Sequence, residues 1–298
     1  MIRFFVGFGG YLVGLFLSTA FASPFAFWLI DSIMPEAFPF KRVFNRVLMV
    51  NALLLLWPLT KWWKISSWAA VGIAKTAKMF KDLVRGWGLG LITLGVVVAL
   101  ELAFDARIIA LDMEPGDATG YFFGSSVLGF FEEILFRGVF YLAVVRLLNK
   151  SEAWNHKIII AFFSSLFYSV THFAKVQHID TITLMSGITA WGTIFSYGTG
   201  IEYLIMRGIS YFGVGMCLCA LVERQGVLWG AMGLHAGWVF TLKTTERLTD
   251  MNPDSRWAHW IFGNDLVTGV DTYAMLIILF VVIAFPVYKG VTNEFRVQ

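Results

Sequence analysis

The chain has 298 residues, of which 58% are hydrophobic and only 14% are charged, and its formal net charge at pH 7 is +3. Because about a quarter of the residues in soluble domains are charged, this composition excludes a water-soluble monomer and indicates a membrane protein. The small net charge excludes a broad nucleic-acid-binding surface, so no nucleic acid is expected as a partner.

Eight apolar segments approach the length of a transmembrane helix, which needs about 20 mostly apolar residues. None of them shows the period-2 alternation of a membrane β-barrel strand. The predicted fold class is therefore all-α: a polytopic membrane protein with about eight transmembrane helices in contact with the lipid bilayer. One membrane domain is predicted over residues 1–298. The predicted spans are 4–30, 43–60, 87–104, 124–148, 158–173, 197–221, 227–243 and 272–288.

The segment 61–86 differs from these spans because basic residues alternate with Trp and Phe. This pattern predicts an amphipathic helix that lies on an anionic membrane surface. The positive-inside rule then places the segment, and with it both ends of the chain, in the cytoplasm. The basic residues of the segment are Lys61, Lys64, Lys75, Lys78, Lys81 and Arg85.

Charged side chains inside a span are costly and indicate function by default. The fourth predicted span contains Glu132, Glu133 and Arg137 among large apolar residues. Glu133 and Arg137 are i,i+4 neighbours on a helix and are predicted to pair, whereas Glu132 points about 100° away from Glu133. A buried ion pair that holds helices together would explain Glu133 and Arg137. It does not explain why a second acid, Glu132, lies in the same apolar span. Glu101, near the end of the third span, is expected at the membrane interface.

Two histidines lie in later spans. His172 is at the end of the fifth span, one helical turn after Tyr168, where an interfacial histidine is the simpler interpretation. His235 lies among the pairs Gly226/Gly230 and Gly233/Gly237, within the second of them. Such small residues allow helices to approach closely, so the His235 imidazole is predicted to face a neighbouring helix. We expect Glu132, His172 and His235 to converge on one polar cavity.

These residues carry a family resemblance. Glu132-Glu133-x-x-x-Arg137 resembles the E-E-x-x-x-R motif of the CPBP family, the CAAX protease and bacteriocin-processing family that is also called ABI. Tyr168-x-x-x-His172 resembles its F-x-x-x-H motif, with Tyr in place of Phe. His235-x-x-x-Val239 is similar to the third motif, in which Asn or Asp usually follows the His by four residues.

The resemblance implies an eight-helix intramembrane protease with its core in residues 87–243. It implies that Glu132 is the catalytic glutamate, that His172 helps it to activate water, and that His235 stabilises the oxyanion. Glu133 and Arg137 would support and orient this group. The implied substrate is a membrane-associated or lipidated peptide or protein, and the implied location is a bacterial inner (plasma) membrane.

Other interpretations remain open. Val239 cannot donate a hydrogen bond through its side chain, so the chain could be an inactive CPBP-fold protein that binds a membrane partner. Buried Glu, His and Arg also serve proton-coupled transporters, although the sequence shows no inverted repeat. No cofactor is expected. Two His and one or two Glu could bind zinc, but the histidines lie on different spans without a recognised metal spacing. No activated Ser or Cys is evident.

Overall fold

The computed structural model describes residues 2–65, 67–114, 116–148, 154–174, 176–194, 200–258, 263 and 265–294. The fold is mostly helical, as the apolar runs predict, and each of the eight predicted spans falls on a helix or on consecutive helices. The chain divides into two compact units, residues 1–66 with 170–200 and residues 67–169 with 201–298. The single membrane domain remains a prediction.

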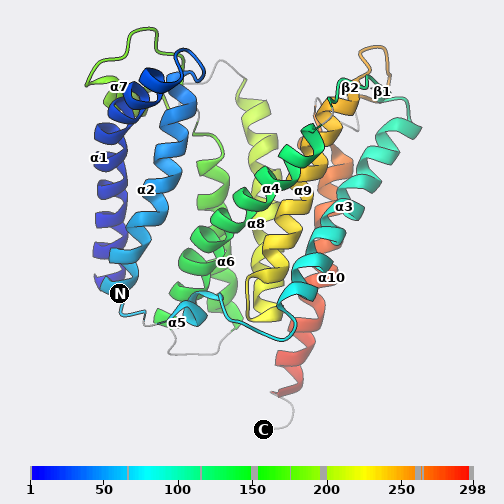
Figure 1. The fold of residues 1–298 in the computed structure, drawn as a ribbon. Coiled ribbons are helices and arrows are strands. Elements are labelled where there is room, and N and C mark those ends of the chain that lie inside the picture. The colour runs from blue at the N-terminus through cyan, green and yellow to red at the C-terminus, as the bar shows by residue number, and fades with distance from the viewer. Residues whose placement is uncertain are drawn as a thin grey trace. The chain divides into compact units, whose positions relative to one another are not determined.

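The first unit is built on two long apolar helices that lie side by side (Figure 1). They are α1 (Ile2–Ile33) and α2 (Phe40–Trp62), and the short helix α7 (Ser186–Thr193) packs against both. Phe44 on α2 is fully buried, and its ring meets the Trp191 ring edge-on at 5.7 Å. These aromatic contacts connect α2 to a segment about 150 residues further along the chain.

The second unit contains the remaining elements (Figure 1). Its principal contacts pair α3 with α9, α4 with α9, and α8 with α10. At one end, two three-residue strands pair antiparallel, with Ile108 opposite Asp250. The elements are η1 (Trp68–Val71), α3 (Met79–Ala103), β1 (Arg107–Ile109), α4 (Asp117–Glu133), η2 (Ile134–Ala143), α5 (Val144–Leu147), α6 (Trp154–Thr171), α8 (Ile201–Gln225), α9 (Trp229–Leu248), β2 (Thr249–Met251) and α10 (Val270–Glu294).

Glycines bring α3 and α9 into backbone contact. A Cβ atom at Gly90 would lie 2.6 Å from the Leu234 carbonyl oxygen, and one at Gly233 would overlap the Leu83 carbonyl oxygen. The predicted close approach through Gly233 and Gly237 is therefore confirmed, with α3 as the partner helix. Gly226 has another role, because it directly follows α8 with φ +70° and its backbone N–H donates to the Val222 carbonyl oxygen at 2.8 Å, which ends that helix.

Four helices in the described part of the chain are long and apolar enough to cross a membrane, namely α1, α2, α3 and α8. Shorter apolar stretches lie in α6 and α10, at His156–Thr171 and Val270–Phe285. The count of about eight spans therefore remains a prediction.

The prediction of one amphipathic helix over 61–86 is wrong. The segment holds the end of α2, the short 3-10 helix η1, a non-helical stretch and the beginning of α3. Gly72 ends η1 with φ +80°, and its carbonyl oxygen accepts a hydrogen bond from the Leu228 backbone N–H at 3.0 Å. The Trp229 indole N–H donates to the Ala74 carbonyl oxygen at 2.8 Å. The stretch that follows η1 therefore caps the beginning of α9, and no single helix covers residues 61–86.

Candidate functional site

The charged part of the fourth predicted span lies at a junction between two kinds of helix. The α-helix α4 ends at Glu133, and the chain continues as the π-helix η2. Arg137 lies in η2, where nine of the ten residues are buried. π-Helical turns are rare and frequently occur at functional sites. The change in helix type therefore coincides with the candidate site.

The predicted pairing of Glu133 with Arg137 is present. Arg137 Nη1 donates to Glu133 Oε1 at 2.9 Å, and the two side chains are 1% and 0% exposed. The Arg137 guanidinium carbon lies 4.3 Å from the centre of the Tyr168 ring, a cation–π distance. Tyr168 lies on α6, so the guanidinium connects α6 to the α4–η2 junction.

His235 on α9 completes the cluster. Its Nδ1 lies 2.9 Å from Glu133 Oε1, and its Nε2 lies 3.7 Å from Glu132 Oε2. A carboxylate only accepts hydrogen bonds, so its contact with Nδ1 assigns a proton to that nitrogen. The Nε2 atom is thereby directed to Glu132. The predicted inward orientation of His235 is confirmed, since only 4% of its side chain is exposed.

The two glutamates have different surroundings. Glu133 is sealed at 0% exposed, whereas 20% of the Glu132 side chain is exposed. Close contact between α4 and α9 holds the cluster together, because a Cβ at Gly129 would lie 3.1 Å from the Ala236 backbone nitrogen. Of the two acids, Glu132 is the more exposed.

His172 immediately follows α6 and is half-buried. It belongs to the first compact unit, whereas Glu132, Glu133, Arg137 and His235 belong to the second. The first motif, with its two glutamates and arginine, and the third motif, with His235, therefore meet in one cluster within the second unit. The convergence of His172 on that cluster remains a prediction.

Hydrogen-bond donors close to Val239 are already used. The Trp238 indole N–H donates to the Thr93 hydroxyl at 2.9 Å, and the Thr241 hydroxyl donates to the Gly237 carbonyl oxygen at 2.9 Å. Both side chains are buried. In this structure neither one replaces the donor that a side-chain amide at position 239 would supply.

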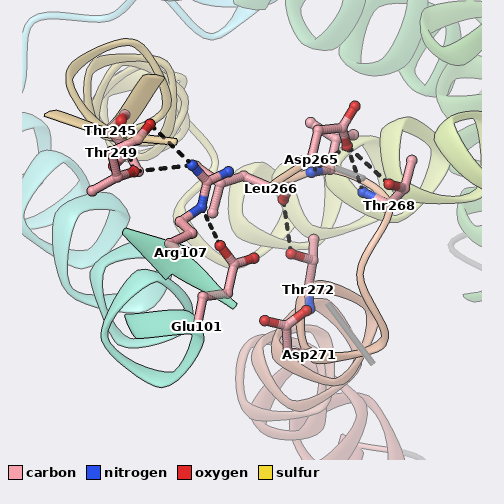
Figure 2. Close-up of polar contacts among 10 residues, drawn as sticks. Glu101, Arg107, Thr245, Thr249, Asp265, Leu266, Thr268, Asp271 and Thr272 are labelled. Atoms are coloured by element: carbon pink, nitrogen blue, oxygen red, sulfur yellow. Dashed lines mark hydrogen bonds and ion pairs between the residues drawn. The ribbon is translucent and has the colours of Figure 1, made fainter. Parts of the chain in front are cut away.

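A second buried charged cluster lies at the end of α3, where Arg107 sits between Glu101 and Thr249 (Figure 2). Glu101 is 0% exposed and is paired with Arg107 Nε, and its position at the membrane interface remains a prediction. Arg107 Nη1 also donates to the Thr249 hydroxyl at 3.0 Å. The first residue of β1 thereby connects the end of α3 to the beginning of β2.

Beside this cluster, the chain before α10 is held by local hydrogen bonds (Figure 2). Asp265 Oδ1 accepts from the Thr268 backbone N–H at 2.9 Å and from its hydroxyl at 3.0 Å. The Thr272 hydroxyl donates to the Leu266 carbonyl oxygen at 2.8 Å. Asp265 also accepts a hydrogen bond from the Tyr203 hydroxyl of α8 at 2.9 Å, a long-range contact that residue spacing does not reveal. Its contacts give it a structural role at the beginning of α10.

Within the described residues, no group of three or more His, Cys, Asp or Glu side chains is arranged to hold a metal ion. The chemistry that Glu132, Glu133 and His235 can supply directly is proton transfer and charge stabilisation. Zinc dependence remains a hypothesis for experiment.

The fold and this cluster define a mostly helical protein with long apolar helices and a buried acid–base site. Residues 115–241 match the family model described as type II CAAX prenyl endopeptidase Rce1-like, which is part of the CPBP family. The match confirms the resemblance that the motifs predict, and it supports an integral membrane protein, a membrane endopeptidase and a membrane-associated protein substrate. All five predicted site residues lie within the matched range. The chain matches no curated protein and no solved structure.

Proposed function

We propose that this protein is an intramembrane endopeptidase that hydrolyses a peptide bond in a membrane-associated or lipidated substrate, with water as the nucleophile. The observation that carries the proposal is the contact of one histidine with two adjacent glutamates. His235 Nδ1 lies 2.9 Å from Glu133, and its Nε2 lies 3.7 Å from Glu132. The proposed location is a bacterial inner (plasma) membrane.

Exposure separates the roles of the two acids. A general base must come within hydrogen-bond reach of the water from which it takes a proton, and Glu132, at 20% exposed, is the accessible acid. Glu133 is fully buried, and its Oε1 atom already accepts hydrogen bonds from Arg137 Nη1 and His235 Nδ1. We therefore assign the base to Glu132, with His172 as the group that shares its proton, and an orienting role to Glu133 and Arg137.

The proposed role of His235 follows from its fixed ring. With the Nδ1 proton donated to Glu133, Nε2 donates to the oxygen on which charge develops during hydrolysis when the ring carries a proton on both nitrogens. A pre-oriented donor costs no reorganisation during the reaction, and the low-dielectric surroundings strengthen its effect. Oxyanion stabilisation is accordingly assigned to His235 Nε2.

A second candidate function is that of an inactive CPBP-fold protein that binds a membrane partner. The observation that favours it is Val239, together with the engagement of Trp238 and Thr241 in other hydrogen bonds. Loss of one oxyanion donor costs about 10²–10³-fold in rate. The two functions differ in one measurable property, because the binding protein cleaves nothing.

The experiment uses purified protein in lipid nanodiscs and a fluorophore–quencher peptide that carries a farnesylated cysteine followed by two aliphatic residues and a terminal residue. The unprenylated peptide is compared in parallel. We expect wild-type protein to cleave at least one of the peptides and Glu132→Gln to abolish cleavage, because the substitution preserves size and removes the basic oxygen.

The matched control is Glu202→Gln, which makes the same chemical change at an exposed carboxylate on α8. Its cleavage rate should equal that of the wild type. Wild-type activity in Glu132→Gln would contradict the assignment of the base. Cleavage of neither peptide by the wild type would instead support the partner-binding function.

A further inference from the structure

A serine on α6 donates a hydrogen bond to the π-helix η2. The Ser164 hydroxyl donates to the Phe136 carbonyl oxygen at 3.1 Å, and the two residues are 5% and 4% exposed. A serine inside a helix can donate to a carbonyl oxygen of its own preceding turn, as Ser126 does with Phe122 at 2.7 Å. Ser164 instead donates to another helix, to a residue 28 positions earlier in the chain. This buried bond therefore fixes η2 relative to α6.

The acceptor of this bond belongs to the peptide unit that carries Arg137. The Phe136 carbonyl and the Arg137 amide nitrogen lie in one planar peptide bond, so a donor that fixes the carbonyl also fixes the backbone from which the Arg137 side chain starts. The Phe136 ring is held as well, because it contacts the Phe167 ring of α6 at 5.8 Å between centroids. Helix α6 thus contacts both the backbone and the side chain of the residue directly before the arginine.

Arg137 connects this position to the acids of the site. Its Nη1 donates to Glu133 Oε1 at 2.9 Å, and the same oxygen lies 2.9 Å from His235 Nδ1. His235 Nε2 lies 3.7 Å from Glu132 Oε2. Four successive contacts therefore connect the Ser164 hydroxyl to the Glu132 carboxylate.

The length of η2 calls for support from its neighbours. Most π-helical turns occur singly inside α-helices, whereas η2 has ten residues. The Tyr141 hydroxyl of η2 donates to Glu223 on α8 at 3.0 Å, and a Cβ at Gly138 would lie 2.9 Å from the Val71 carbonyl oxygen of η1. Of these contacts, the one from Ser164 reaches the peptide unit of the site arginine.

We propose that Ser164 is a positioning residue of the glutamate–histidine site, which acts through Arg137. Its hydroxyl holds the arginine against Glu133, so that the shared carboxylate keeps the His235 ring in the orientation that directs Nε2 to Glu132. This inference rests on the proposed peptidase function, and it gives Ser164 no contact with the substrate. Removal of the hydroxyl should displace the arginine and the histidine ring while the fold stays intact.

The test compares the wild type with Ser164→Ala, Ser164→Thr and the matched control Ser169→Ala, using the peptide that the wild type cleaves. Ser169 is also buried on α6, but its hydroxyl donates to the Gly208 carbonyl oxygen of α8 at 2.9 Å. Ser164→Ala should lower kcat about 10–100-fold with KM nearly unchanged, because small displacements of catalytic groups reduce the rate. Ser164→Thr retains a hydroxyl donor and should avoid most of this loss. Ser169→Ala should keep the wild-type kcat.

A second measurement follows His235 directly and needs no substrate. Protein with ¹⁵N-labelled histidine is compared by NMR in lipid nanodiscs, and the His235 signals are assigned by their absence in His235→Gln. We expect Ser164→Ala to shift the His235 Nδ1 signal, because the carboxylate that binds this nitrogen is displaced. Ser169→Ala should leave the signal unchanged.

A wild-type kcat together with an unshifted His235 signal in Ser164→Ala would overturn the inference and leave the peptidase function in place. An equal loss of kcat in Ser164→Ala and Ser169→Ala would also overturn it, because the effect would then be one of general packing. If the wild type cleaves neither peptide but Ser164→Ala alone shifts the His235 signal, the peptidase function fails and the positioning role of Ser164 stands.

Discussion

Replacement of Arg137 by methionine is the perturbation for which the structure gives the clearest magnitude. Arg137 and Glu133 are 1% and 0% exposed and are joined at 2.9 Å. Removal of one partner of a buried ion pair costs roughly 3–5 kcal/mol, because the other charge stays buried. His235 Nδ1 still contacts Glu133 in the variant, which favours the lower end of this range. Loss of the cation–π contact with Tyr168 adds about 0.5–2 kcal/mol.

The assay is equilibrium unfolding by SDS titration in mixed micelles, followed by tryptophan fluorescence. Arg137→Met should lower the free energy of unfolding by about 3–5 kcal/mol. Arg137→Met combined with Glu133→Gln should recover most of that loss, because no buried charge remains. Arg224→Met is the control, since Arg224 is exposed on α8 and its replacement should change stability by no more than about 0.5 kcal/mol. A loss below about 1 kcal/mol in Arg137→Met would refute the buried-pair reasoning.

Three further predictions concern packing, the second charged cluster and metal ions. Gly233→Ala should destabilise by about 1–3 kcal/mol in the same titration, because its Cβ would overlap the Leu83 carbonyl oxygen. Gly88→Ala, where a Cβ meets nothing within 4 Å, should be neutral or stabilising by up to about 1 kcal/mol. Arg107→Met should cost roughly 3–5 kcal/mol in this titration by leaving Glu101 buried and unpaired, and adding Glu101→Gln should reverse most of the loss. Dialysis against a chelator should leave peptide cleavage unchanged; a loss that zinc restores would assign a metalloprotease.

The positions of the long helices could be predicted because apolar runs of this length have few alternatives in a membrane. The segment 61–86 was predicted incorrectly for a local reason. Its basic and aromatic residues fit an interfacial helix, but Gly72 adopts φ +80° and its carbonyl oxygen binds the beginning of α9. That partner lies more than 150 residues further along the chain, and periodicity carries no information about it.

The candidate site was predictable where contacts are local. The spacing of Glu133 and Arg137 specifies an i,i+4 pair, and the glycines around His235 indicate a helix interface. The choice of Glu133 as the partner of His235 Nδ1 depends on how α4 meets α9, which spacing does not determine. The pairing of Arg107 with Thr249 could not be predicted either. The two strands that bring them together have three residues each, too few to show the two-residue alternation of a β-strand in the sequence.

The distance between the Glu132 carboxylate and the His172 imidazole tests the central claim most directly. It can be measured in an experimental structure of the protein in lipid nanodiscs. The proposed mechanism predicts that the two groups lie close enough to share one water molecule, roughly 3–6 Å apart, with His235 on the same cavity. A separation above about 10 Å, with His172 turned toward lipid, would contradict glutamate–histidine activation of water.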